Sequence, residues 1–174
     1  AANQIKPFAD AASEVFVVVD PLAPEAQQSM AAYFAELDRR FDGGFDPGDA
    51  LAEAGDAFRE PGGCFVVVRD HTGTIGCAGV QFIDDTTGEV KRMWIGPAAR
   101  GRGLGRRLLQ HVEDIISATG RTRVLLDTNG SLKEAIAMYG SAGYREIGPY
   151  NDNPYAQHWF EKHLPPTDDP ADAT

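Results

Sequence analysis

The sequence predicts an α/β fold in which a mixed β-sheet carries α-helices on its faces. In the first half of the chain, short β-branched runs separated by turns are typical of a strand meander. In the second half, strand patterns alternate with amphipathic helical patterns. The chain has 174 residues, of which 43% are hydrophobic, enough for one packed core. We therefore expect a single domain over residues 1–164 and a disordered acidic tail over residues 165–174.

The first predicted elements are a strand, a helix and a long connection. The Val-Phe-Val-Val-Val run at residues 15–19 predicts a strand that ends at an Asp-Pro pair. Apolar side chains spaced by three and four predict a helix over residues 24–41, and Pro24 suits its first turn. Residues 45–63 are rich in Gly, Asp and Pro, so we expect a surface connection with a short helix over residues 49–58.

Three strands follow this connection. Residues 64–69 and 75–83 are predicted to form a hairpin around the Asp-His-Thr-Gly turn at residues 70–73. Residues 84–88 form a second turn, and residues 89–95 form a third strand that stops at a Gly-Pro pair. The three strands together predict an antiparallel meander.

The remaining elements alternate between helices and strands. Residues 104–119 show one apolar helical face and end at a glycine. Residues 124–126 are all apolar, which is the pattern of a strand buried on both faces. A second amphipathic helix is expected over residues 132–139. The last two predicted strands are residues 144–147 and 158–164.

The two cysteines are expected to be free and buried. If the hairpin is centred on its turn, Cys64 faces Gly79 and Cys77 faces Val66, so the thiols are out of register for a disulfide. Two cysteines also lack the spacing of a zinc site, so no metal is expected. Residues 1–10 lack the features of a signal peptide, and no apolar run is long enough for a membrane span. We therefore expect a cytoplasmic protein.

Charge is distributed unevenly along the chain. The formal net charge is −10 at pH 7, which disfavours nucleic acid and anionic membranes as partners. Between Lys91 and Arg145, however, ten basic residues stand against four acidic ones, so this window carries +6 and the remainder carries −16. A basic centre within an acidic chain favours an anionic cofactor beside a cationic substrate. Solvated faces that happen to differ in charge would give the same counts.

The glycine-rich run at residues 96–105 carries the clearest chemical signal. A predicted strand leads into it and an amphipathic helix follows, so the free N–H groups of a helix N-terminus can bind an anion there. Glycine lets oxygen atoms approach the backbone, and arginine adds charge-assisted hydrogen bonds to phosphate. The spacing of its glycines differs from G-x-G-x-x-G, and no G-K-[ST] ending is present. Both common nucleotide-binding loops are therefore excluded.

Two motifs in this part of the chain resemble those of a known family. Arg100, Gly103 and Gly105 form an R-x-x-G-x-G run that resembles the pyrophosphate loop of the GNAT superfamily, the acetyl-CoA-dependent N-acetyltransferases. As in the family, the run lies between a strand and an amphipathic helix. Residues 134–144 resemble the second signature of the family, a helix ending in Ala-x-x-x-Tyr followed by a Gly-aromatic pair. The resemblance extends over residues 64–164.

The resemblance implies a fold and a cofactor. The expected fold is a single GNAT-like domain with a mixed, mostly antiparallel sheet that splays open after residue 95 and is flanked by helices. Acetyl-CoA is the implied acetyl donor, without a metal. Its pantetheine arm would lie in the gap, where one backbone N–H polarises the thioester carbonyl. The implied cofactor-binding residues are Met93, Trp94 and Ile95 through their backbone, and Arg100, Gly101, Arg102, Gly103, Leu104, Gly105 and Arg106 around the pyrophosphate.

Two residues match catalytic positions of the family. Glu89 is where a family glutamate takes a proton from the acceptor amine, directly or through water, because an ammonium has no lone pair with which to attack. An exposed glutamate after a turn is the alternative. Tyr139 matches the tyrosine that protonates the departing CoA thiolate, although core packing would also explain an aromatic residue on that helix face. Neither cysteine has an activating neighbour, so we expect direct transfer in a ternary complex.

The acceptor is expected to be a small primary amine that is cationic in solution, because the chain outside the basic window is strongly acidic. The variable acceptor segment of the family begins near Arg39 and Arg40, which also suit the C-terminal end of a helix dipole. Aromatic rings can hold an alkylammonium, although the polar loop before the last strand is equally well explained as an ordinary hairpin loop. The candidate acceptor contacts are Phe41, Tyr150, Asn153, Tyr155 and His158.

Two alternatives to an acetyltransferase stay open. The chain could be a non-catalytic module that senses CoA or mediates an interaction, although the presence of both Glu89 and Tyr139 favours an enzyme. It could also use a longer acyl-CoA, which depends on the cavity behind the thioester. The oligomeric state is open as well, with a homodimer as one option.

Overall fold

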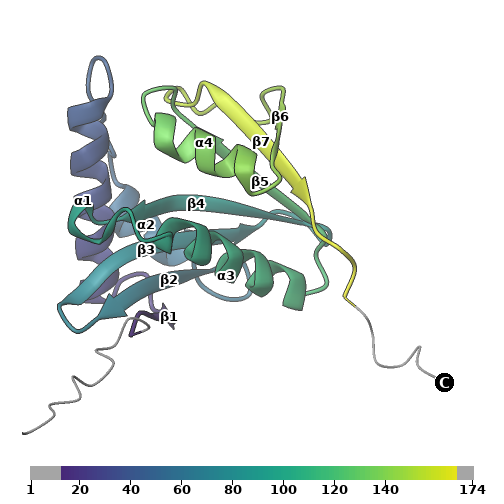
Figure 1. Ribbon diagram of the computed structural model, residues 1–174, viewed down its shortest axis with the longest axis horizontal. Helices are drawn as coiled ribbons and strands as arrows, with labels where there is room; N and C mark the ends of the chain where they lie inside the picture. Colours follow the sequence, from purple (N-terminus) through teal and green to yellow (C-terminus); the bar gives the residue numbers. More distant parts are fainter. Residues whose placement is uncertain (1–12, 168–174) are drawn as a thin grey trace, which may run out of the picture.

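The computed structural model describes residues 13–167; residues 1–12 and 168–174, with most of the predicted tail, lie outside the described part. The described residues form a β-sheet with helices on both faces (Figure 1), which confirms the α/β prediction. A 3₁₀ turn spans Pro97–Ala99. The strands are β1 (Val15–Val19), β2 (Gly63–Asp70), β3 (Gly73–Phe82), β4 (Thr87–Ile95), β5 (Arg123–Thr128), β6 (Arg145–Ile147) and β7 (His158–His163), and the helices are α1 (Pro24–Arg40), α2 (Ala50–Ala57), α3 (Leu104–Ala118) and α4 (Lys133–Ser141).

The sheet is mixed and mostly antiparallel, as expected. Its seven strands, all within the described residues, lie in the order β1-β2-β3-β4-β5-β7-β6. Every neighbouring pair is antiparallel except β4 and β5, which run parallel. A parallel pair needs a crossover, and α3 provides it between these two strands.

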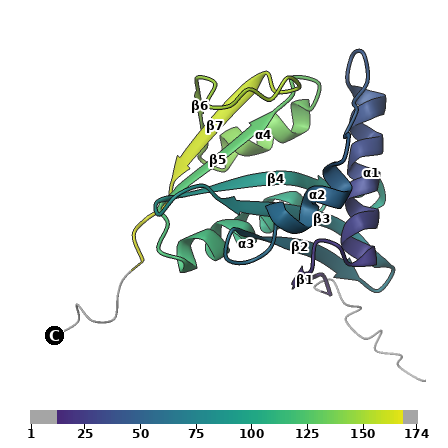
Figure 2. The same ribbon diagram turned by 180° about the vertical axis from the view of Figure 1, so that it is seen from behind.

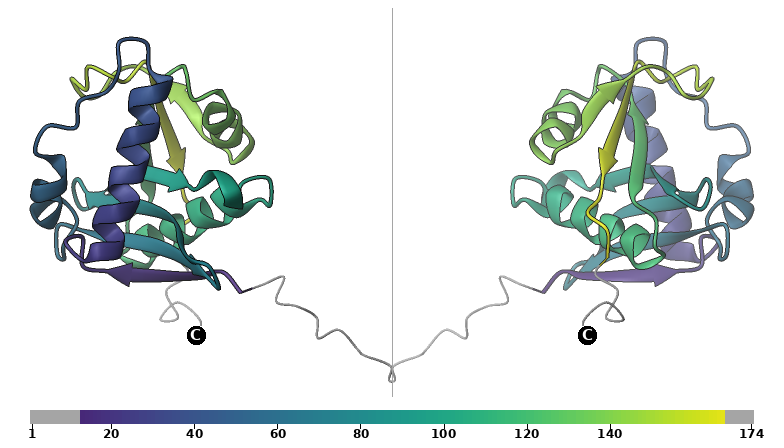
Figure 3. Two further views of the ribbon diagram at one scale, coloured as in Figure 1. Left: turned by 90° about the vertical axis from the view of Figure 1, so that its left-hand side faces the viewer. Right: turned by 90° about the vertical axis from the view of Figure 1, so that its right-hand side faces the viewer.

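The two faces of the sheet carry different helices (Figures 2 and 3). Helices α1 and α2 cover one face, whereas α3 and α4 cover the other. Strand β2 shows the consequence: Phe65 and Val67 pack in the core under α1, and Val66 and Val68 pack in the core under α3. All four side chains are fully buried, which explains why the strand is apolar at consecutive positions. No helix of the described part is both long and apolar enough to cross a membrane.

The predicted elements occur in the predicted order, and their ends differ from the observed ones by two residues at most. The predicted hairpin register is wrong by one residue. Cys64 pairs with Val80 and Cys77 pairs with Val67, because a β-bulge after Val68 inserts an extra residue into the ladder. Both cysteines are free and buried, as expected, and burial raises the pKa of Cys64 to about 11.

Strands β4 and β5 separate soon after they meet. They pair only over residues 87–89 of β4 and 123–125 of β5, and beyond Glu89 they diverge into a V (Figure 1). A register irregularity lies in β4 at this point, where Arg92 has a left-handed φ of 54°. Helix α1 stands across the open end of the V (Figure 3). Beyond Glu89, the edge of β4 that faces β5 therefore has no strand partner among the described residues, while the other edge stays paired with β3. The expected splayed sheet is confirmed.

Candidate active site

Two cavities open along the split between β4 and β5. The first, the loop cavity, has a volume of about 370 Å³ and is bordered by the end of β4 and the loop that leads into α3. The second, the aromatic cavity, has a volume of about 380 Å³ and is bordered by Phe34, Phe41, Phe45 and Tyr155. The two cavities meet inside the split, because six residues border both: Tyr33, Leu37, Met93, Leu132, Ala135 and Tyr139.

The loop cavity contains a cluster of free backbone donors. The N–H groups of residues 101–106 have no hydrogen-bond acceptor among the residues that the structure describes. Three of them open α3, where the helix dipole is positive. Gly101 and Gly103 adopt φ angles of 82° and 70°, which other residues rarely adopt, and Gly103 is the N-cap of the helix. Such a set of donors suits a pyrophosphate.

Nine of the ten residues predicted to bind the cofactor border the loop cavity. Arg102 does not, because its guanidinium lies 3.6 Å from the carboxylate of Glu14. Gly105 lies where α3, β4 and α4 meet, and a Cβ there would be only 3.3 Å from the sulfur of Met138. The nine residues are Met93, Trp94, Ile95, Arg100, Gly101, Gly103, Leu104, Gly105 and Arg106.

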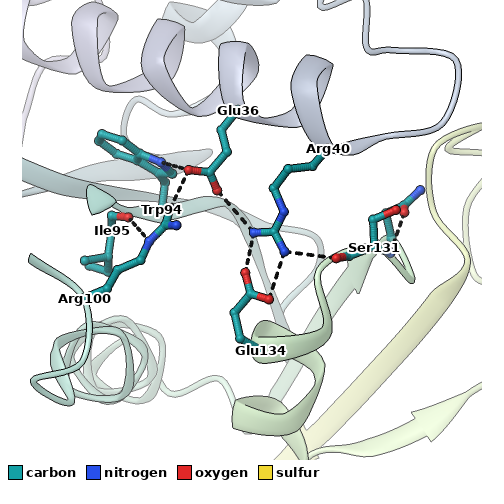
Figure 4. A network of polar contacts seen from close by, with 8 residues as sticks. Glu36, Arg40, Trp94, Ile95, Arg100, Ser131 and Glu134 are labelled. Carbon is teal, nitrogen blue, oxygen red and sulfur yellow. Dashed lines mark hydrogen bonds and ion pairs between the residues drawn. The ribbon is translucent and has the colours of Figure 1, made fainter. Parts of the chain in front are cut away.

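Charged side chains link α1 to α4 across the split (Figure 4), and we name this set, Glu36, Arg40, Arg100 and Glu134, the charged strap. Arg100 donates to Glu36 at 2.5 Å. Arg40 donates to Glu36 at 3.4 Å and to Glu134 at 2.9 Å. The hydrogen bond from Arg40 lowers the pKa of Glu134 to about 2. The predicted phosphate ligand Arg100 is thus held by a carboxylate of α1.

Tyr139 lies where the two cavities meet. Its ring is 6% exposed and packs against Tyr144 and Phe160. Its hydroxyl oxygen is accessible and makes no hydrogen bond with any residue that the structure describes. Burial, and to a lesser extent the charge of Asp127, raises the pKa of Tyr139 above its ordinary value. The side chain therefore packs in the core and also presents a neutral phenol to the junction.

A second tyrosine borders the same junction. Tyr33 belongs to α1, and its position among apolar helix residues gave no sign of a role in a site. Its hydroxyl likewise has no hydrogen-bond partner among residues 13–167. Burial raises the pKa of Tyr33 above its ordinary value, and the charge of Tyr139 adds to this effect. Tyr33 is thus a second candidate for moving a proton at the junction.

Glu89 is 4% exposed, so the alternative of a solvated turn residue is wrong. Its carboxylate accepts a hydrogen bond from the Tyr150 hydroxyl at 2.6 Å and lies 3.4 Å from the ammonium of Lys91. Burial, and next the charge of Glu89, raises the pKa of Tyr150, which keeps the donor protonated. Glu89 borders neither cavity, whereas Lys91 borders the aromatic one. A proton from that cavity would need an intermediary to reach Glu89.

The predicted acceptor contacts divide into two groups. Phe41, Asn153 and Tyr155 border the aromatic cavity. Tyr150 and His158 border neither cavity. Tyr150 is engaged with the buried carboxylate described above, and the imidazole of His158 lies 2.6 Å from an exposed carboxylate of β6. The structure therefore gives no geometric support for His158 as an acceptor contact.

Arg92 and Asp127 complete the wall of the aromatic cavity. The Arg92 guanidinium lies over two phenylalanine rings, with its carbon 4.8 and 5.3 Å from their centroids. Asp127 accepts hydrogen bonds from the amides of Asn151 at 2.6 Å and Asn153 at 3.2 Å. Sequence reasoning did not select Asp127. The available signal was a carboxylate immediately after the buried apolar strand residues 124–126.

Known proteins share both the sequence and the fold. The sequence profile of the Acetyltransferase (GNAT) family matches residues 30–144. The protein named IAA acetyltransferase of Azospirillum brasilense is 38% identical over 87 residues, which cover 49% of this chain. The same match covers 57% of that relative, so the chain spans a little over half of the relative's length.

Two solved structures show the fold. A GNAT-family acetyltransferase of Staphylococcus aureus is 16% identical, with a TM-score of 0.74 over 87% of this chain and 99% of that one. A GNAT-family acetyltransferase of Elizabethkingia anophelis, solved with acetyl-CoA bound, is 15% identical, with a TM-score of 0.65 over 88% of this chain and 99% of that one. The profile match covers most of the chain, including the free donors of the loop, Tyr139 and the split sheet, and on this ground the chain belongs to the acetyltransferase (GNAT) family.

Proposed function

We propose that the chain transfers the acetyl group of acetyl-CoA to the nitrogen of a small primary amine, by direct transfer in a ternary complex. The observation that carries this proposal is the meeting of the two cavities at Met93 and Tyr139. One cavity offers anion donors and the other offers aromatic and charged side chains, so two different reactants can meet there. The structure of the Elizabethkingia relative with acetyl-CoA bound supports the choice of donor.

The residues of the loop cavity fit acetyl-CoA by the chemistry of their donors. The free N–H groups of residues 101–106 would hold the pyrophosphate, with Arg100 and Arg106 adding positive charge. The unpaired edge of β4 would bind the amide groups of the pantetheine arm, and one of its N–H groups would polarise the thioester carbonyl. When bound, acetyl-CoA supplies an activated acyl carbon at the junction. Arg100 donates to Ile95 and Glu36 through Nε and Nη2, and its Nη1, which has no acceptor among the described residues, would bind a phosphate oxygen.

The proposed chemistry assigns a proton to each catalytic residue. The amine nitrogen forms a bond to the acyl carbon while the carbon–sulfur bond breaks, so the nitrogen must lose a proton and the sulfur must gain one. Glu89 takes the proton from the amine through water, because it lies outside both cavities. Tyr139 gives a proton to the thiolate, and its raised pKa keeps it protonated until then.

Several expectations from the sequence stay predictions. They are the cytoplasmic location, the single domain, the lack of a metal requirement, and the exclusion of nucleic acid and membranes as partners. Two alternatives stay open. The acyl-CoA series described below would test the use of a longer acyl-CoA, and a measurement of mass in solution would test for a homodimer.

The test uses the purified chain, a series of acyl-CoA esters and a panel of small amines. We expect acetyl-CoA to raise the melting temperature, because a ligand that binds only the folded state stabilises it. We also expect thiol release that depends on an amine, with the acetylated amine found by mass spectrometry. Stabilisation by acetyl-CoA without thiol release for any amine would instead indicate a module that senses CoA. Faster release from longer esters would change the assigned donor.

A further inference from the structure

The aromatic cavity is bordered by a cation and two anions that form no ion pair with any of residues 13–167. Four charged residues border it: Asp46, Lys91, Arg92 and Asp127. Lys91 is paired with the carboxylate of Glu89. The carboxylate of Asp46 is exposed and caps its own loop by accepting the N–H group of residue 48. Arg92 and Asp127 are partly buried, unlike Asp46, and neither forms an ion pair with any of residues 13–167.

Arg92 is a half-buried cation that lacks an anion. Its Nη1 donates to the sulfur of Met30 at 3.1 Å and to the carbonyl of Ala50 at 3.2 Å. Its Nε and Nη2 have no acceptor among the described residues and are not fully buried, so they remain available at the cavity. The carboxylate that acts on Arg92 from a distance is that of exposed Glu53. A guanidinium with a free N–H fork matches a carboxylate in two-pronged geometry.

Asp127 is the complementary anion across the split. Among residues 13–167, the donors to its carboxylate are the neutral amides of Asn151 and Asn153. It belongs to β5, whereas Arg92 belongs to β4, and these are the two strands that diverge. Both charges act on Tyr33, since Asp127 raises its pKa and Arg92 lowers it. Both residues border the same cavity as Tyr33 and Tyr139, the two tyrosines of the junction.

We propose that the acceptor is a small amino acid or a similar zwitterion, whose carboxylate binds Arg92 and whose ammonium rests against Asp127 before it loses its proton. This inference rests on the proposed acetyl transfer and names its substrate class. Arg92 and Met93 are neighbours on β4 and both border the aromatic cavity, and Met93 also borders the loop cavity. The aromatic rings of the 380 Å³ cavity leave space for an apolar side chain.

The proposal differs from the expectation drawn from charge alone. An amino acid carries the cationic ammonium that the acidic chain favours, but its carboxylate removes the net positive charge and would itself be repelled by the acidic chain. The half-buried guanidinium of Arg92 supplies the local attraction for that carboxylate. Arg92 is thus assigned as the residue that determines acceptor specificity.

The experiment compares amino acids with the amines that remain after their carboxylate is removed: phenylalanine with phenethylamine, and leucine with isoamylamine. Thiol release from acetyl-CoA is measured for each member with the wild-type chain, Arg92→Met and Arg121→Met. Arg121→Met is the matched control, because Arg121 also lies over a phenylalanine ring but borders neither cavity. Stabilisation by acetyl-CoA checks that each variant folds.

In the wild-type chain and in Arg121→Met we expect the amino acid to have a kcat/KM about 10- to 100-fold above that of its decarboxylated partner, the range given by a charged hydrogen bond. In Arg92→Met this preference should vanish, because the amino acid loses rate and the plain amine does not. Asp127→Asn should lower the rates of both members and keep the preference.

Equal or faster turnover of the plain amines by the wild-type chain would overturn the proposal, even if Arg92→Met failed to fold. A preference that survives in Arg92→Met would overturn it as well. Absence of thiol release with every amine would contradict the acetyl transfer itself, which is a different outcome. In that case, stabilisation of the CoA-loaded chain by phenylalanine but not phenethylamine would still support the zwitterion site, and its absence would end the proposal.

Discussion

The loop cavity and the aromatic cavity are built in opposite ways. The loop cavity takes its donors from one continuous segment, residues 100–106, and most of them are backbone N–H groups. The aromatic cavity takes side chains from α1, the connection to α2, β4, β5 and the loop before β7. A site made of backbone needs only the local conformation, whereas a site made of distant side chains can change its ligand by substitution. We expect this difference to separate donor binding from acceptor selection.

The largest effect is expected at the junction of the two cavities. Tyr139→Phe should lower turnover by roughly a hundredfold or more, because it removes a proton donor and leaves the packed ring in place. The affinity for acetyl-CoA, measured by calorimetry, should change little. Tyr33→Phe is the matched control, since it removes the other free hydroxyl of the junction. If Tyr33→Phe abolished turnover and Tyr139→Phe did not, Tyr33 would be the proton donor.

The loop cavity can be disabled separately from the aromatic one. Gly103→Val should weaken acetyl-CoA binding about 10- to 100-fold, because a branched residue resists the φ of 70° and its side chain occupies the space before α3. Gly120→Val is the control at the other end of the same helix: it has a φ of 85° and equally open surroundings. Equal losses of acetyl-CoA affinity in both variants would mean that helix strain, rather than the donor cluster, explains the result.

The next prediction concerns Glu89, the proposed base, which borders neither cavity. Glu89→Gln should lower turnover about tenfold near pH 7 and less at high pH, where the amine is already neutral. The pH profile of kcat is the decisive measurement. Glu161→Gln, which removes another buried carboxylate that borders neither cavity, should keep the wild-type profile. A loss of turnover that is identical at every pH would speak against Glu89 as the base.

The smallest effect is expected at the charged strap, which links α1 to α4 across the split. Arg40 lowers the pKa of Glu134 from 4.5 to about 2, so the charged form is the one that stabilises the fold. This contribution is present above pH 4.5 and is lost as the pH falls towards 2. Because Glu134 is exposed, Glu134→Gln should cost only about 0.2–1 kcal/mol of unfolding free energy at pH 7.

The pH dependence of that cost separates the ion pair from other effects of Glu134. The difference between wild type and Glu134→Gln, measured by denaturant unfolding, should shrink as the pH falls below 4.5. Glu134 also lies in the first turn of α4, where a carboxylate interacts with the helix dipole. In an Arg40→Met background the substitution should therefore cost less, and an unchanged cost there would assign the effect to the dipole.

The sequence predicted the loop cavity better than the aromatic one, and the construction of each explains why. The need for glycine at positions 101 and 103 comes from local backbone angles, which a short motif can encode. The helix that carries Tyr139 follows a signature of similar length. Tyr33 and Asp127 border the same cavity only because α1 packs across a sheet that splits between β4 and β5. No spacing along the chain indicates that they share a cavity.

Two further differences between the sequence prediction and the structure have local physical causes. The hairpin register shifted because a bulge after Val68 added one residue, and a bulge leaves no clear pattern in a run of β-branched residues. His158 belongs to the polar loop expected to border the acceptor, but it begins β7 and pairs with Glu146 instead. The neighbouring Asn153 and Tyr155, from the same loop, do border the aromatic cavity.

The unpaired edge of β4 is placed differently from the free edges that β-proteins usually have to protect. At the outer border of a sheet, free ladder groups attract strands of other molecules and promote aggregation. Here the free edge lies inside the molecule, between two halves of one sheet that meet over three residues of each strand. A thin ligand with its own amide groups could complete the ladder there. In such a complex the amide hydrogens of residues 90–95 would exchange with water more slowly, and the donor would become the missing strand of the sheet.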